Sequence, residues 1–95
     1  MTETTVRRID DVRATVRAVV IELAPERDDS ATRETGLVEG LGYQSLSLLE
    51  LAFTLEDEFD LEPIEEAVAR QITTLGALED HVIGQLAARG EILDG

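Results

Sequence analysis

The sequence predicts a small all-α domain, a bundle of three long helices and one short helix with a long loop after the first. Three observations favour this class. The chain has 95 residues, enough for a single domain over residues 1–95. Its apolar residues make up 43% of the chain and recur at helical spacing. No stretch alternates apolar and polar side chains as a half-buried strand would.

The first helix is predicted over residues 5–23. Its apolar residues fall within an arc of about 140° on a helical wheel, and they are Val6, Ile9, Val12, Val16, Val19, Val20 and Leu23. Pro25 marks its end. A loop over residues 24–44 follows, and loops of this length in small domains are often functional. We expect Leu37, Val38 and Leu41 to anchor it to the core.

The second helix is predicted over residues 45–59, a short helix over about 64–70, and the last helix over 74–89. Pro63 precedes the short helix, and Gly90 is placed to end the last one. One face of the last helix carries Leu75, Leu78, Val82 and Leu86.

The helix over residues 45–59 has two apolar stripes where a surface helix needs one. The first stripe consists of Leu48, Leu51, Ala52, Leu55 and Phe59. The second stripe consists of Leu46, Leu49 and Phe53. It is flanked by Glu50 and Asp57 on one side and by Glu56 and Asp60 on the other. One interpretation packs the second stripe under the 24–44 loop. This packing can also apply to part of the stripe, in which case Leu46 is the residue we expect to be shielded. The other is an exposed apolar strip edged with carboxylates, suited to a partner's apolar groove edged with Arg and Lys.

Charge narrows the classes of function. The net charge is −13, with eight Arg and no Lys, and residues 34–69 contain ten acidic residues and no basic one. This composition argues against nucleic acid and anionic membranes as partners. The acidic run is interpreted either as a solvated face, which is the commoner case, or as a docking surface for basic partner proteins. The apolar runs are too short to span a bilayer, and the N-terminus lacks the apolar segment of a secretory signal. We therefore expect a cytoplasmic monomer.

Catalytic and metal-binding constellations are not expected. The chain has no Cys and one His, which excludes disulfides, thiolate nucleophiles and Cys-ligated metals. Ser45 begins the second helix, and a helix N-terminus accommodates a phosphate well. Its simpler interpretation is an N-cap. Ser47 competes for that role, because Ser47 and Glu50 have the spacing of a capping box.

Several segments resemble the acyl carrier protein family. The resemblance covers nearly the whole chain in order, from the first helix to the last. The matching segments are Thr35–Glu39, Leu41–Leu46 (LGYQSL), Leu49–Leu51 (LEL), Leu55–Phe59 (LEDEF) and Ile72–Gly76 (ITTLG). Where that family usually has Asp before the Ser, this chain has Gln44.

The resemblance implies that Ser45, flanked by Gln44, bears 4′-phosphopantetheine. A phosphopantetheinyl transferase would supply this group from coenzyme A with Mg²⁺, and its thiol would hold acyl groups as thioesters. The chain would then be a carrier and not an enzyme. Its partners would be acyl-loading, ketosynthase or acyltransferase-type enzymes with basic docking surfaces. The family's partner-binding positions correspond here to Leu46, Leu49, Glu50, Phe53, Glu56 and Asp57.

The absence of Lys beside abundant Arg, Ala, Leu and Val suggests a GC-rich bacterial source. Together with Gln44, it favours polyketide, antibiotic or other natural-product synthesis, with fatty-acid synthesis as a further option. Two alternatives stay open. One is an aminoacyl or peptidyl carrier. The other is an unmodified acidic helical adaptor that binds partners through Leu46, Leu49 and Phe53.

Overall fold

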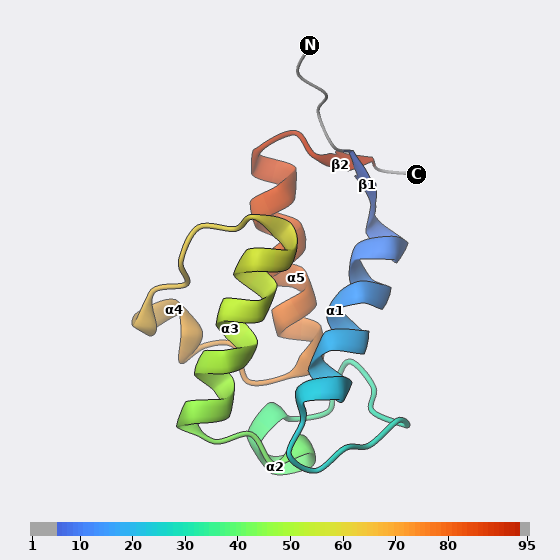
Figure 1. Cartoon of the computed structure of the whole chain (residues 1–95). Helices are drawn as coiled ribbons and strands as arrows, with labels where there is room; N and C mark the ends of the chain where they lie inside the picture. Colours follow the sequence, from blue (N-terminus) through green and yellow to red (C-terminus); the bar gives the residue numbers. More distant parts are fainter. Residues whose placement is uncertain (1–5, 94–95) are drawn as a thin grey trace.

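The computed structural model describes residues 6–93, and it confirms the predicted all-α bundle (Figure 1). Three long helices form the bundle: α1 (Ile9–Leu23), α3 (Ser45–Phe59) and α5 (Leu75–Ala88). The smaller elements are α2 (Leu37–Leu41), α4 (Glu66–Ala69), β1 (Arg7–Arg8) and β2 (Ile92–Leu93). Among residues 6–93, no helix combines the length and apolar character needed to cross a membrane.

The core lies where the three long helices meet. α1 contacts both α3 and α5, and the apolar stripe of each helix faces inward. The buried residues of these helices include Val12, Val16, Val20, Leu51, Leu55, Phe59, Leu75, Leu78, Val82 and Leu86. Burying one such side chain contributes about 1.5–3 kcal/mol. Val6 and Leu23, placed by the wheel on the same inward arc, are exposed because they lie before and at the end of α1.

The ends of the described chain differ from the sequence prediction. Residue 5, the predicted start of the first helix, lies outside the described residues. Within them, β1 pairs with β2 in parallel, with Arg7 opposite Ile92. The Arg7 guanidinium lies 4.9 Å from the centre of the Phe59 ring, a cation–π distance. Strands of two residues are too short to show an alternating pattern, so the sequence could not reveal them.

The connection between α1 and α3 is not a continuous loop, because it contains the one-turn helix α2. Leu37 and Leu41 of α2 are buried, as predicted. Val38 is 58% exposed, so it does not anchor the connection to the core. Gly42 ends α2 with a φ of +73°, a left-handed conformation that favours glycine.

Backbone hydrogen bonds join this connection to the start of α5. The N–H of Gly76 donates to the carbonyl of Arg33 at 2.8 Å. The N–H of Leu37 donates to the carbonyl of Thr73 at 2.9 Å. At the N-cap of α5, the Thr74 hydroxyl accepts a bond from the N–H of Ala77. The connection is therefore fixed to α5 by main-chain contacts, which do not depend on side-chain identity.

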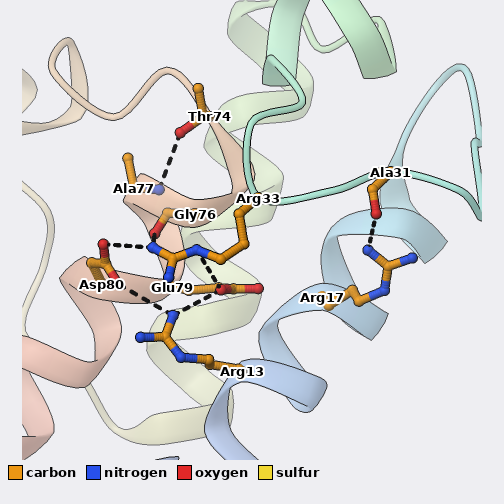
Figure 2. Close-up of polar contacts among 9 residues, drawn as sticks. All are labelled: Arg13, Arg17, Ala31, Arg33, Thr74, Gly76, Ala77, Glu79 and Asp80. Atoms are coloured by element: carbon orange, nitrogen blue, oxygen red, sulfur yellow. Dashed lines mark hydrogen bonds and ion pairs between the residues drawn. The ribbon is translucent and has the colours of Figure 1, made fainter. Parts of the chain in front are cut away.

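Side chains add an ion-pair cluster at the same junction (Figure 2). Glu79 of α5 is buried, and its Oε1 lies 2.9 Å from Arg13 Nη1 and 3.7 Å from Arg33 Nε. Asp80 pairs with the same two arginines: its Oδ1 lies 3.2 Å from Arg13 Nη1, and its Oδ2 lies 2.8 Å from Arg33 Nη2. Beside this cluster, Arg17 donates a hydrogen bond to a carbonyl of the connection. Arginines of α1 and of the connection thus neutralise the acidic side chains of α5.

Candidate functional site

Ser45 is the first residue of α3, and the residues before it are held in place by the rest of the bundle. Tyr43 is fully buried, and its hydroxyl donates a hydrogen bond to the carbonyl of Val20 at 2.6 Å. Burial raises the pKa of Tyr43 to about 12, so the hydroxyl stays protonated, and able to donate, well into the alkaline range. α3 therefore begins at a point fixed against α1.

The Ser45 hydroxyl takes no part in capping α3. Gln44 is the N-cap residue, and its N–H donates to Ser47 Oγ at 2.7 Å. Ser47 Oγ donates in turn to the carbonyl of Gln44 at 3.1 Å. No hydrogen bond joins the Ser45 hydroxyl to another residue of the range 6–93, and Ser45 is exposed. The N-cap interpretation of Ser45 is therefore wrong, and Ser47 pairs with Gln44 instead of forming a box with Glu50.

The second apolar stripe of α3 faces solvent. Leu46 is 69% exposed, Leu49 50% and Phe53 59%. The connection between α1 and α3 does not cover them, and Leu46 is the most exposed of the three, contrary to the expectation that it is shielded. We call Leu46, Leu49 and Phe53 the α3 strip. Exposed apolar side chains grouped on one helix are typical of binding surfaces.

The carboxylates beside the α3 strip are not equivalent. Glu50 and Asp57 are exposed. Glu56 is half-buried, and its Oε2 accepts a hydrogen bond from the N–H of Ile64 at 3.2 Å. Glu56 therefore also holds the segment that leads to α4. Glu50 and Asp57 are the two of these carboxylates whose charge is fully presented to solvent.

A groove opens beside Ser45, between α3 and the segment that contains α4. Its volume is about 540 Å³. Nine of its lining residues are apolar, and the others are Ser45, Glu66 and Arg70. The apolar lining includes Leu48, Leu49 and Ala52 on α3, with Ile64, Ala69 and Ile72 opposite. Sequence reasoning missed this groove, although Ile64 and Ile72, each isolated among polar residues, are a signal of it. An apolar hollow that starts at a free hydroxyl can shelter an apolar chain attached to that hydroxyl.

A second hollow of about 550 Å³ adjoins the groove. Leu37, Leu48, Ala69, Arg70 and Ile72 line both spaces. The second hollow is more polar, because Glu34, Glu39 and Thr74 are also part of its wall. Within residues 6–93, no three His, Cys, Asp or Glu side chains are grouped to hold a metal ion.

No family model matches the chain, but solved structures do. An acyl carrier protein of Enterococcus faecalis, described as highly thermostable, shares 26% identity, covers 83% of this chain and 99% of its own length, and has a TM-score of 0.69. An acyl carrier protein of Thermotoga maritima shares 26% identity over 85% of this chain and 93% of its own, also with a TM-score of 0.69. The hexanoyl-loaded carrier of the actinorhodin polyketide synthase of Streptomyces coelicolor shares 30% identity. It covers 90% of this chain and 98% of its own length, with a TM-score of 0.66.

The chain belongs to the acyl carrier protein family. Identity of 30% over nearly the full length of a carrier, with the same fold, decides this point. The acyl carrier protein fold accounts for the three long helices, the short fourth helix and the long first connection. The structural neighbours of the chain are carrier proteins, which supports a carrier role for it.

Proposed function

We propose that this protein carries acyl groups on 4′-phosphopantetheine attached to the Ser45 hydroxyl. The observation that carries the proposal is the state of that hydroxyl: it is exposed, free of capping bonds, and opens on an apolar groove. The bound group would supply a thiol that holds the cargo as a thioester. The chain has no Cys of its own, so the loaded protein would present one reactive thiol.

The residues around Ser45 fit this group. The four N-terminal N–H groups of a helix carry partial positive charge, which suits a phosphodiester at Ser45. The capping hydrogen bonds join Gln44 and Ser47, so they leave the Ser45 hydroxyl oxygen free for attachment. The groove offers an apolar lining that would keep a saturated or partly reduced acyl chain out of water.

The α3 strip and its carboxylates support a role in docking. An exposed apolar strip beside Glu50 and Asp57 complements an apolar groove edged with Arg or Lys. We propose that transferases and acyl-processing enzymes, including ketosynthase and acyltransferase types, recognise this face. Its charge would speed their encounter with the carrier at low ionic strength.

We propose a polyketide or related natural-product pathway in a bacterial cytoplasm. Similarity to the carrier of the actinorhodin polyketide synthase supports this assignment. The neutral Gln44 before Ser45 separates this chain from the usual family pattern. Since Gln44 removes a negative charge at the site, we expect transferases to differ in how well they modify this protein.

Intact mass spectrometry tests the proposal. The protein is incubated with coenzyme A, Mg²⁺ and a broad-specificity phosphopantetheinyl transferase. We expect a mass increase of one phosphopantetheine in the wild type and none in Ser45→Ala. Ser47→Ala is the matched control, because it removes a neighbouring hydroxyl that caps the helix, and it should still be modified. No increase with any transferase, including one from the host pathway, would favour the unmodified adaptor.

A further inference from the structure

The charged residues of the groove form one pair. Among the lining residues within the described range 6–93, Glu66 and Arg70 are the charged ones. Arg70 is the only Lys or Arg between residues 34 and 88. It lies at the C-terminal end of α4, and it lines both the groove and the second hollow. The single cation of this region therefore lies at the hollow that begins at Ser45.

The present partner of Arg70 holds it weakly. Arg70 Nη2 lies 2.6 Å from Glu66 Oε1, one helical turn earlier. Both side chains are largely exposed, at 76% and 80%. Exposed pairs of this kind contribute little to stability, because solvent screens them and ordering two long side chains is unfavourable. Arg70 can therefore exchange Glu66 for a better partner at little cost.

An anion at this position has few cationic partners available. Ten carboxylates and no basic residue occupy residues 34–69. Besides the N-terminal N–H groups of α3, Arg70 is the cation that lines the groove within residues 6–93. A guanidinium presents paired N–H donors that match two oxygens of a phosphate or carboxylate. Such bonds are about twice as strong as bonds between neutral groups.

Given the proposed function, on which this inference rests, we propose that Arg70 binds an anionic oxygen group at the mouth of the groove. Two groups with this chemistry would be present there. One is the phosphodiester of the arm on Ser45, and the other is the terminal carboxylate of a dicarboxylic acyl cargo. On binding either, Arg70 releases Glu66 and holds the arm toward the groove.

NMR spectroscopy of the loaded protein tests this contact directly. The arm is added to wild type, Arg70→Ala, Arg70→Lys, Glu66→Gln and Arg27→Ala, and attachment is confirmed first by intact mass. We expect the Arg70 side-chain N–H signal to move on loading, and the phosphorus signal of Arg70→Ala to differ from wild type. Arg70→Lys should fall between them, because it keeps the charge without the paired donors. Added salt should move the wild-type signal toward that of Arg70→Ala.

Arg27→Ala is the matched control. Arg27 is an exposed arginine with an acidic partner two residues away, and it does not line the groove. Its removal should leave the phosphorus signal unchanged. Glu66→Gln frees Arg70 and removes a competing carboxylate, so it should enlarge the difference caused by Arg70.

Three loaded forms separate the two sources of the anion. With a free thiol or an acetyl cargo, only the phosphodiester is anionic, whereas malonyl cargo adds a carboxylate. An Arg70 effect in all three forms assigns the contact to the phosphodiester, and an effect with malonyl alone assigns it to the cargo. Equal spectra for wild type and Arg70→Ala in every form would overturn the inference and leave the proposed function intact. A protein that accepts no arm would refute both.

Discussion

The packing of the α1–α3 connection on α5 predicts opposite effects for one substitution at two glycines of the same helix. Gly84 is exposed, and a Cβ added there would meet no atom of the described part of the chain within 4 Å. Gly76 is buried, and its added Cβ would lie 2.9 Å from the carbonyl oxygen of Arg33 and 2.8 Å from Arg33 Nε. The side chain of Arg33 can move, but its carbonyl is fixed by the hydrogen bond from Gly76 itself.

The expected free energies follow from these contacts. Alanine in place of glycine stabilises a helix by roughly 0.5–1 kcal/mol, because the unfolded chain loses freedom. Gly84→Ala should show this gain. In Gly76→Ala the gain from helix propensity is at most the same, and overpacking against Arg33 opposes it at a cost of about 1–3 kcal/mol. We therefore expect Gly76→Ala to be less stable than Gly84→Ala by about 2 kcal/mol, or roughly 8–16 °C in Tm for a domain of this size.

Urea denaturation followed by far-UV circular dichroism measures this difference. The slope of the transition should be equal in the two variants, since neither changes the surface exposed on unfolding. Equal stabilisation by both substitutions would refute the close contact between Arg33 and the start of α5. It would also remove the main-chain basis for fixing the connection there.

Three further predictions concern charge. Glu79→Gln should destabilise the fold by about 1–3 kcal/mol in urea denaturation, because it weakens the buried end of the ion pair with Arg13; a change within about 0.5 kcal/mol would contradict this. Tyr43, the only tyrosine, has its folded pKa raised to about 12, above the unfolded value of about 10. Its contribution to stability should be complete below pH about 10 and lost as pH rises through about 12. A phenolate absorbance titration of the folded protein with a midpoint near 10 would disprove the raised pKa. Reversing Glu50 and Asp57 to Lys should lower the kcat/KM of phosphopantetheinyl transfer by roughly two- to five-fold per site at low salt without changing Tm, and unchanged turnover would count against α3 as the docking face.

The long helices could be predicted because burial of an apolar stripe decides where they form. Val12, Val16 and Val20 recur at helical spacing and lie in the core. The ends of the elements depend on other forces. Val6 belongs to the same arc, yet it precedes the helix and is exposed. A periodic pattern does not report where backbone hydrogen bonding begins.

The candidate site was predictable in part. Ser45 is a candidate because of its neighbours in the sequence, but its free hydroxyl depends on which residue caps α3. The capping hydrogen bonds join Gln44 and Ser47. Residue spacing alone does not distinguish this pair from the other local pairs that could cap the helix. The groove requires segments distant in sequence, such as those of Leu48 and Ile72, to pack side by side. Their mutual distance is a tertiary property, and single-helix patterns carry no information about it.

The strand pair β1–β2 determines how this domain could be joined to other polypeptides. Both strands lie at the pole where α3 ends, as the contact between Arg7 and Phe59 requires (Figure 1). Ser45 lies at the other end of this 15-residue helix, about 20 Å away. A linker, tag or neighbouring domain attached beyond either strand would therefore extend from the side opposite the site. A connection at that pole would leave the end of α3 that carries Ser45 open to the partner enzymes proposed above.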